Sequence, residues 1–385
     1  MKYKIMNCDV CVVGAGVSGV AAAVAAAKRG ASVVLFEQNN FPGGTAVIAM
    51  HNFICGINHS NKGLVKKITD KIAFGAKPIK RGKVLLLPFK TGKLILGLSQ
   101  IIKSDKKIKF FCKSEVVSVK VSKRRVSSII AKNTGGKIII KPKSVIDASG
   151  EGDLIRLSGA KYRVSPLSKR QLSGFSFMLK NIKGNNEELA WKVPYCLTQA
   201  VSAGKLPRYF KFTVFSPAYS QGEGFIRLNI PASKQERGGK FTDKIAARIH
   251  SYLRESLPEF RVSYITGVSP KVSNREGLRL LGEYVLREED LLKKNKFFDT
   301  VACGNWPIEF WDKINGPAFT YLKGKGSYEI PLRSLKSRNI NNLFAAGRCI
   351  SVDSSVLAST RVLGTCISLG EAAGIAARNY ARTLS

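Results

Sequence analysis

Acidic residues, histidines and clustered cysteines are scarce in this chain of 385 residues. It has 26 Asp and Glu against 63 Lys and Arg, which gives a formal net charge of +37. There are three histidines, His51, His59 and His250, too few to favour a histidine-rich metal site. The eight cysteines lie far apart except for Cys8 and Cys11, and the spacings typical of iron–sulfur and zinc sites are absent. We therefore expect no bound metal.

Long hydrophobic runs are also scarce. The segment 10–27 carries no charge, but its glycine spacing is typical of a turn and a buried helix rather than of a signal peptide or a membrane span. No second run approaches that length, so we expect no membrane span and a cytoplasmic location. Cys8 and Cys11 lie in a strand-like run, where we expect them to be buried as small hydrophobic residues.

The most informative segment present is a glycine-rich turn that follows the apolar run 9–13. Its sequence is Gly14-Ala15-Gly16-Val17-Ser18-Gly19. The glycines allow a tight turn, a close approach of the backbone to a pyrophosphate, and close packing of the next helix on the strand. The free N–H groups at the start of that helix bind a diphosphate without a lysine. The segment therefore predicts a strand, a phosphate-binding turn and a helix.

A second strand and an acidic residue complete this pattern. The segment 31–36 reads as a parallel strand that ends at Phe36, and Glu37 follows it. A carboxylate at this position, about 20 residues after the glycines, accepts hydrogen bonds from ribose hydroxyls. The first forty residues therefore predict an adenine dinucleotide site.

Much of the positive charge lies between residues 61 and 145. This segment has 23 Lys and Arg and only three acidic residues. Basic residues alternate with or bracket apolar strands in 107–111, 120–126 and 137–141, as in a sheet with one solvated face. The charge indicates either a solvated face or a contact with an anionic partner such as RNA, an acidic protein or a membrane surface. No RNA-binding motif is present to favour nucleic acid.

Three blocks of sequence, taken together, carry a family resemblance. The first is the glycine turn with 40–46, the second is 144–154, and the third is 342–351 followed by 361–366 and a helix to residue 377. In this order and spacing they resemble the FAD-dependent oxidoreductase family that includes the heterodisulfide reductase A-like proteins. The resemblance implies non-covalent FAD, with the third block at its ribityl and diphosphate portion and the helix near residue 364 directed at the isoalloxazine. Some relatives carry a 4Fe-4S cluster, which the cysteine spacing here does not support.

The residues expected to bind the cofactor come from all three blocks. They are Gly14, Ala15, Gly16, Val17, Ser18, Gly19, Phe36, Glu37, Gly43, Gly44, Thr45, Ala148, Ser149, Gly150, Asp153, Gly347, Arg348, Gly364 and Thr365. Small residues in the helix after 364, including Gly370 and Gly374, are equally compatible with close helix packing.

The predicted fold class is α/β. We expect a Rossmann-like, doubly wound FAD-binding domain formed by 1–160 and 330–385, with a β-meander inserted in the basic segment 61–145. A second, α+β substrate or cap domain is expected over 161–329, with helices at 242–256 and near 286–292. The strand that ends in 147–150 is expected to return beside the first strand.

The substrate site is expected near Arg275 and Arg279, which resemble an arginine-rich segment of the relatives. Four residues apart, they share a face and offer a bidentate site for a carboxylate or phosphate; pairing with Glu276, Glu283 or backbone carbonyls is the alternative. Two departures from the relatives leave the general base open: a tryptophan in 306–311 stands where a histidine is common, and Gly364 replaces a proline. The candidates for the base are Glu309, Asp312, Tyr284 and Arg279, and the cysteines expected near the flavin are Cys55, Cys349 and Cys366.

The leading hypothesis is a flavoenzyme that moves a hydride or an electron pair between bound FAD and a small, anionic substrate. The alternative is a flavin-containing electron-transfer or sensor protein that docks an acidic partner or RNA through the basic segment. A flavin-dependent enzyme that modifies nucleic acid would combine these two hypotheses, although no residue of the chain points specifically to that activity.

Overall fold

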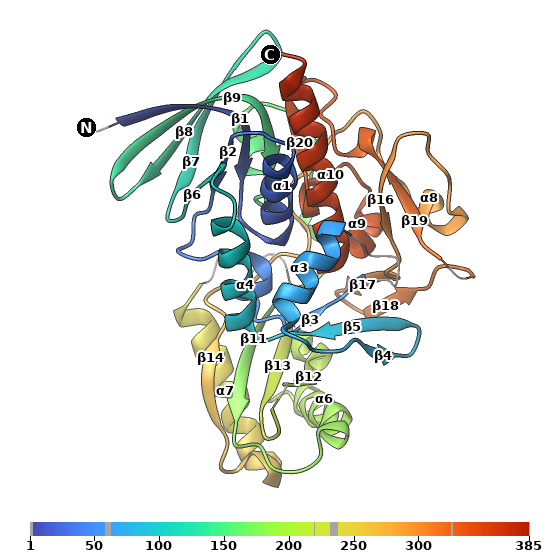
Figure 1. Cartoon of the computed structure of the whole chain (residues 1–385). Helices are drawn as coiled ribbons and strands as arrows, with labels where there is room; N and C mark the ends of the chain where they lie inside the picture. The colour runs from blue at the N-terminus through green and yellow to red at the C-terminus, as the bar shows by residue number, and fades with distance from the viewer. Residues whose placement is uncertain (1–2, 58–62, 219, 232–237, 325, 385) are drawn as a thin grey trace.

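A seven-stranded sheet forms the centre of the first domain (Figure 1). The computed structural model describes residues 3–57, 63–218, 220–231, 238–324 and 326–384; His59 and the first two residues of the basic segment lie outside them. The strand order is β6-β2-β1-β9-β8-β7, and β20 pairs with β9. The strands are β1 (Tyr3–Val13), β2 (Val33–Phe36), β6 (Ile108–Phe111), β7 (Glu115–Ser122), β8 (Arg125–Asn133), β9 (Gly136–Asp147) and β20 (Leu343–Ala345).

The parallel part of this sheet is buried on both faces. All four residues of β2 are buried, as in parallel sheets covered by helices. The predicted return of the chain beside the first strand is confirmed, because β9 runs parallel to β1 with Asp147 opposite Val13. Ala345 of β20 lies opposite Asp147 on the other side. The three blocks of the sequence therefore end at one edge of the sheet.

Two long helices, α1 (Val17–Lys28) and α10 (Leu363–Arg382), pack closely on each other (Figure 1). Their contact depends on glycines of α10. A Cβ at Gly370 would lie 2.1 Å from the carbonyl oxygen of Ser18, and one at Gly374 would lie 2.2 Å from that of Ala22. These two glycines therefore serve helix packing. The sequence was compatible with this role as well as with the resemblance to the flavoprotein family.

The basic segment contains the expected β-meander and, in addition, two helices that were not expected. Its first part forms the helices α3 (Gly63–Ala73) and α4 (Thr91–Lys103), and β6 joins the parallel sheet beside β2. Only β7, β8 and β9 form an antiparallel meander. The physical reason is a buried helical stripe of leucine and isoleucine in α3 and α4, with a period of three to four residues. A small sheet lies next to these helices, with β3 (Phe53–Ile54), β4 (Ile79–Arg81) and β5 (Val84–Pro88) (Figure 1).

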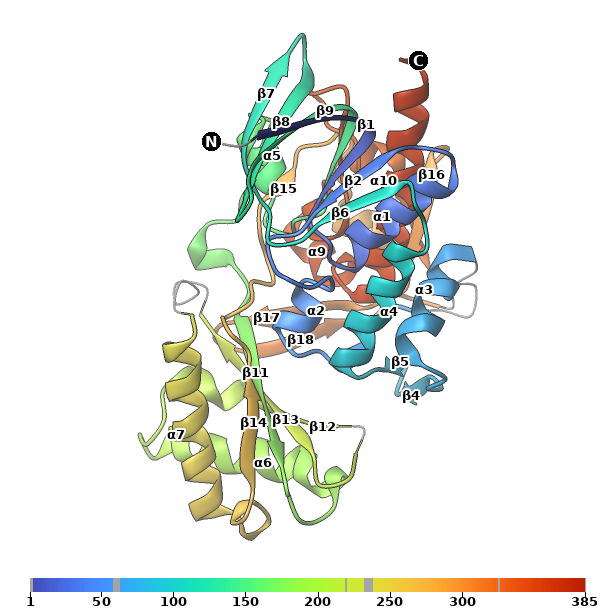
Figure 2. The ribbon, with the colours of Figure 1, turned by 60° about the vertical axis from the view of Figure 1, so that its left-hand side comes forward.

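A second domain lies below the first in both ribbon views (Figures 1 and 2). Its antiparallel sheet has the order β12-β13-β11-β14, and two helices pack with it around a separate core that runs from Phe175 to Val272. Its elements are β11 (Ser173–Lys180), α6 (Asn186–Ser202), β12 (Val214–Pro217), β13 (Gly224–Ile230), α7 (Lys240–Ser256) and β14 (Tyr264–Val268). We call this unit the cap.

The cap is shorter than the expected range 161–329. Leu278, Leu286, Tyr328 and Ile330 are buried in the core of the first domain, because the chain after the cap returns to it. The strands of this return form three two-stranded sheets, in which β15 pairs with β10 from before the cap, β16 with β19 and β17 with β18. The strands are β10 (Tyr162–Arg163), β15 (Arg279–Leu280), β16 (Thr300–Gly304), β17 (Ile308–Asp312), β18 (Gly316–Thr320) and β19 (Tyr328–Pro331).

The remaining helices are short. They are α2 (Thr45–Ile48), α5 (Asp153–Leu157), α8 (Glu288–Lys293) and α9 (Ser354–Thr360). Throughout the described ranges, no helix has both the length and the apolar character needed to cross a bilayer.

Candidate active site

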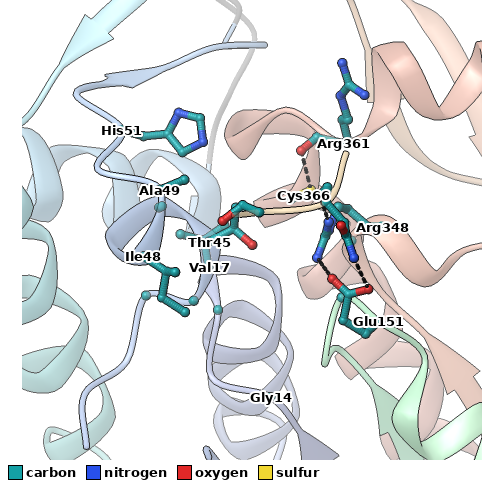
Figure 3. Close-up of a pocket in the computed structure, with 18 of the residues that line it drawn as sticks. Gly14, Val17, Thr45, Ile48, Ala49, His51, Glu151, Arg348, Arg361 and Cys366 are labelled. Carbon is teal, nitrogen blue, oxygen red and sulfur yellow. Dashed lines mark hydrogen bonds and ion pairs between the residues drawn. The ribbon is translucent and has the colours of Figure 1, made fainter. Parts of the chain in front are cut away.

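A cavity of about 780 Å³ lies where the first domain meets the cap. One end is lined by the glycine turn and Glu37, and the other by cap residues such as Arg227 and by Trp311. Figure 3 shows His51 and Arg361 at the end of the cavity that lies away from Gly14. The volume is typical of sites that enclose a ligand of cofactor size.

The glycine turn has the geometry that its sequence predicted. Gly14 has a φ of +98°, and its N–H donates to the carbonyl oxygen of Phe36 at 2.8 Å. A Cβ at Gly19 would lie 1.8 Å from the carbonyl oxygen of Gly14, so only glycine allows α1 to approach the turn. Gly14 and Gly19 are therefore required by the conformation and packing of the protein, whether or not a ligand is bound.

Gly16 is the exception, because nothing in the protein requires a glycine there. Its φ of −62° suits any residue, and the nearest atom to an added Cβ would be the Cα of Gly44, at 4.0 Å. Gly16 lines the cavity and is the N-cap of α1, which has no side-chain cap and no acidic residue in its first turn. The N–H groups of that turn are therefore left for a ligand, as a bound diphosphate needs.

Glu37 is fixed at the carboxyl end of β2. Its side chain is buried, with one carboxylate oxygen accepting from the N–H of Ala15 at 2.9 Å. The other oxygen accepts from the backbone N–H of Asn39 at 2.9 Å. That second oxygen also accepts from the side-chain amide of Asn39 at 2.6 Å, so the oxygen bonded to Ala15 is the one that retains a lone pair. Because Glu37 lines the cavity, this oxygen fits a ribose hydroxyl.

The second block forms a turn around a buried carboxylate. Burial raises the pKa of Asp147, although its oxygens accept from the N–H groups of Ser149, at 3.0 Å, and Ile155, at 2.9 Å. These bonds hold Ser149 and Gly150 at the edge of the cavity. The turn therefore presents backbone and a small hydroxyl, rather than bulky side chains, to a ligand.

The third block brings Gly347 and Arg348 to the cavity. Gly347 has a φ of +67°, and a Cβ there would lie 2.7 Å from the hydroxyl of Ser18. Arg348 donates to the carboxylate of Glu151 at 2.9 Å and to the carbonyl oxygen of Asn274 (Figure 3). Arg348 thus joins the second and third blocks through an ion pair.

Most of the expected cofactor residues line the cavity. Those that do are Gly14, Gly16, Val17, Ser18, Phe36, Glu37, Gly43, Gly44, Thr45, Ala148, Ser149, Gly150, Asp153, Gly347 and Arg348. Ala15, Gly19, Gly364 and Thr365 lie behind this surface. The N–H of Gly364 donates to the carbonyl oxygen of Cys55 at 2.8 Å, a bond that the proline common in relatives would remove.

The cap contributes the polar face of its sheet to the other end of the cavity. On β13, Ile226 and Leu228 point into the core of the cap, while Arg227 and Asn229 alternate with them and line the cavity. Opposite them on β11, Gly174 pairs with Asn229 and Ser176 with Arg227. One face of this sheet thus builds the core of the cap and the other builds the site.

The two arginines expected to hold a substrate are separated by the structure. Arg275 lines the cavity, where it donates to the side-chain oxygen of Asn229 at 2.7 Å and stacks on Trp311 at 4.5 Å. Arg279 does not line it: this side chain is buried in β15, with Glu276 at 3.4 Å and the hydroxyl of Ser165 at 2.9 Å. The shared face is not formed because the segment is not a continuous helix or strand.

Only one of the four candidate bases lines the cavity. Glu309 does, and its two oxygens accept from the indole N–H groups of Trp306, at 2.9 Å, and Trp311, at 2.8 Å. The hydroxyl of Tyr284 instead donates to Asp290 at 2.9 Å. Asp312 accepts two backbone N–H groups in a surface turn, and Arg279 lies outside the cavity, as described.

Two of the three expected cysteines, Cys55 and Cys366, line the cavity, whereas Cys349 is buried beside Asp147. Burial raises the pKa of Cys366 to about 12 and raises those of Cys55 and Cys349 as well. All three are therefore protonated thiols at neutral pH, and they are free of disulfides. Among the described residues, no cluster of three or more metal-ligating side chains is present.

His51, Arg227 and Arg361 are among the residues of the cavity that were not identified from the sequence. The sequence signal for Arg227 was its alternation with apolar residues: Arg227 and Asn229 lie two residues apart in an otherwise apolar strand, which indicates a polar face. Arg361 lay within the third block but received no role. Burial, together with Arg227, Arg275 and Arg361, lowers the pKa of His51 to about 3, so its imidazole is neutral at neutral pH.

The lowered pKa of His51 predicts a specific acid sensitivity of the cofactor-free protein. Below about pH 6.5 the unfolded chain protonates this histidine, whereas the folded chain does not until about pH 3, so stability falls as the pH falls. Between pH 6.5 and pH 5 the loss is about 1 to 2 kcal/mol. Urea unfolding at both pH values should show a smaller loss for His51→Asn; an equal loss in the two proteins would contradict the expected burial of a neutral imidazole.

Comparison with known proteins places this geometry in a family. A model of the family described as FAD dependent oxidoreductase matches residues 9–383. None of the curated proteins matches the chain. The fold is similar to that of a geranylgeranyl bacteriochlorophyll reductase-like protein from Thermoplasma acidophilum, with a TM-score of 0.53, 13% identity, and coverage of 99% of this chain and 79% of the other.

Two further solved structures share the fold. A flavin-dependent brominase has a TM-score of 0.51 and 13% identity, with 98% of this chain and 80% of the other covered. An aromatic hydroxylase from angucycline biosynthesis has a TM-score of 0.51 and 10% identity, with 90% of this chain and 57% of the other covered. At these identities the likeness shows the fold alone, whereas the family model spans nearly the whole sequence. The chain belongs to the FAD-dependent oxidoreductase family.

Proposed function

We propose that this FAD-dependent oxidoreductase moves a hydride or an electron pair between non-covalently bound FAD and a small anionic substrate. The observation that carries the proposal is the arginine end of the cavity, where Arg275 reaches from the cap side toward a cavity whose other end suits a dinucleotide. Within the family, the resemblance of the third block, 342–351 with 361–366, supports a relationship to the heterodisulfide reductase A-like flavoproteins.

The cofactor is proposed to lie along the row of glycines. Glu37 holds the adenosine ribose, and the open backbone at Gly16 with the uncapped first turn of α1 holds the diphosphate. The third block, at Gly347, faces the ribityl portion. When bound, FAD supplies the two-electron chemistry, while the chain positions the substrate and excludes water.

Arg275 is proposed to hold the anionic group of the substrate. Its guanidinium is fixed by the carbonyl oxygen of Leu172, at 2.5 Å, and by Asn229, and it rests on the ring of Trp311. These acceptors are neutral, so its charge is available for a ligand. A planar guanidinium binds a carboxylate with two parallel hydrogen bonds.

His51 is proposed as the group that takes or gives the substrate proton. The carboxylate of Glu309 is engaged by both indole N–H groups, whereas His51 lines the cavity without such partners among the described residues. Burial and then repulsion from Arg227, Arg275 and Arg361 lower the pKa of His51, so an anion bound between these arginines would raise it. The neutral imidazole is the form that can accept a proton.

The proposal is tested by anaerobic reduction of the purified holoprotein, followed at the flavin absorbance band. NADH, NADPH and a panel of carboxylic acids serve as donors, each acid beside its methyl ester. We expect bleaching by at least one acid and much slower bleaching by its ester. Equal rates for acid and ester would show that the anionic group is not recognised.

Replacement of Arg275 by lysine is expected to weaken recognition of the acid without loss of FAD. Lysine keeps the charge but loses the paired hydrogen bonds and the stacking on Trp311. We expect kcat/KM for the most active acid to fall about 100-fold, as for a lost buried charged hydrogen bond. Unchanged kcat/KM at unchanged flavin content would contradict a role for Arg275.

A further inference from the structure

Three arginines line the end of the cavity that lies away from the glycine turn: Arg227 on β13, Arg275 before β15, and Arg361 directly after α9. None of the three forms an ion pair with a described carboxylate. By contrast, Arg348 pairs with Glu151 at 2.9 Å, and Arg279 lies 3.4 Å from Glu276. This end of the cavity thus gathers three guanidinium groups that have no ion pair with a described carboxylate, unlike Arg348 and Arg279.

Neutral acceptors hold each of these guanidinium groups in place. Arg227 donates to the side-chain oxygen of Asn52 at 2.6 Å and to the hydroxyl of Ser176 at 3.3 Å. Arg361 donates to the side-chain oxygen of Gln171 and to the backbone oxygen of Glu309, both at 3.0 Å. Such contacts fix the position of a guanidinium while leaving its charge to a ligand.

The positive charges repel each other when the cavity holds no anion. Burial, with Arg361 and Arg227 nearby, lowers the pKa of Arg275 to about 9, and burial lowers those of Arg227 and Arg361 to about 10. All three remain charged at neutral pH. Glu309 acts on both Arg275 and Arg361, and Glu276, which also acts on Arg361, lies 3.4 Å from Arg279. Counted together, Arg227, Arg275, Arg279 and Arg361 carry four positive charges against the two negative charges of these glutamates. A ligand with two negative charges balances the remainder.

Arg275 and Arg227 form a row along β13 rather than a single point. Arg275 is held at Asn229 and Leu172, whereas Arg227 is held at Ser176 and Asn52. Asn229 and Arg227 are same-face neighbours on β13, about 7 Å apart along the strand. Two anionic groups separated by a short carbon chain fit such a row better than one compact anion.

Hydrogen-bond capacity also favours two anionic groups. A guanidinium has five N–H donors, and Arg227 uses three of them on described residues, while Arg275 and Arg361 use two each. At least two donors therefore remain on each, more in total than the roughly four acceptor positions of one carboxylate. The indole ring of Trp311 lines this end of the cavity and suits the intervening carbons.

We propose that the substrate is a small dicarboxylate, with one carboxylate at Arg275 and the second held by Arg227 or Arg361. This inference rests on the proposed function and adds the second anionic group to it. A phosphate monoester is the competing dianion, and the test separates the two.

The test is a ligand titration of the purified holoprotein, read as a difference spectrum at the flavin band. The probes are malonate, succinate and glutarate, with propionate and inorganic phosphate for comparison. We expect at least one dicarboxylate to bind at least about 100-fold more tightly than propionate and phosphate, the effect of a second charge-assisted pair. Propionate or phosphate binding as tightly as every dicarboxylate, or no perturbation by any probe, would overturn the inference.

Variants identify the second subsite. Arg227→Lys and Arg361→Lys should keep the flavin content, and at least one should reduce the preference for the dicarboxylate over propionate about tenfold or more. Arg333→Lys is the matched control, because Arg333 also stacks on an aromatic ring, that of Phe298 at 4.7 Å, but lies outside the cavity. An unchanged preference in both cavity variants would contradict the assignment.

The failure of this inference can be told from the failure of the proposed function. If propionate perturbs the flavin as strongly as the dicarboxylates, and monocarboxylic acids reduce it, the oxidoreductase proposal stands and the second subsite does not. If uncharged esters reduce the flavin as fast as any acid, both proposals fall.

Discussion

Replacement of Gly16 by alanine should leave the protein folded but lower its affinity for FAD about 100-fold, the cost of forcing a methyl group into a tight contact. Inside the protein, the added Cβ meets only the Cα of Gly44, at 4.0 Å, and the backbone at Gly16 has an ordinary φ. The methyl group instead occupies the surface over which the diphosphate approaches. Equilibrium titration of the apoprotein with FAD measures the effect.

Gly92→Ala is the control for this experiment. Gly92 lies in the first turn of α4, and a Cβ there meets nothing within 4 Å. Its FAD affinity should equal that of the wild type, and its thermal stability should be equal or slightly higher. If Gly16→Ala binds FAD as tightly as Gly92→Ala does, the diphosphate does not lie at this turn.

Replacement of Gly370 by alanine is expected to destabilise the protein by about 3 kcal/mol or more, at the upper end of the cost of overpacking. The new methyl group would lie 2.1 Å from the backbone oxygen of Ser18, and a backbone atom cannot move away as the end of a flexible side chain can. The clash separates α10 from α1, on which the glycine turn and third block depend. Chemical unfolding at equilibrium measures the loss.

The sign of this effect is informative. Alanine stabilises an exposed helix by about 1 kcal/mol relative to glycine, so intrinsic helix propensity alone predicts a gain. Gly92→Ala has open space and should be neutral or slightly stabilising. A more stable Gly370→Ala variant would show that α1 and α10 are not in the close contact described.

The glycine turn and the parallel strands could be predicted because their signals are local. Gly14 and Gly19 serve the turn and the packing of α1, and β9 returns beside β1 as the small residues after Asp147 indicated. The helices α3 and α4 were obscured by lysines, although their buried residues follow a helical period. Charge composition was a weaker guide there than hydrophobic spacing.

The substrate end of the cavity could be predicted only in part, because it is assembled from segments far apart in the sequence. Arg275 lay within a segment singled out by resemblance, but its partner Asn229 is 46 residues away. Arg227 and Arg361 are brought to the same cavity by the cap sheet and by the end of α9. No spacing rule links such residues, so the arrangement became visible only in three dimensions.

A crystal structure of the holoprotein tests the proposed binding mode most directly. We expect FAD along the cavity, with its adenosine ribose at Glu37, its diphosphate at Gly16 and its isoalloxazine facing Arg275 and His51. FAD bound in the reverse direction, or outside this cavity, would contradict this binding mode.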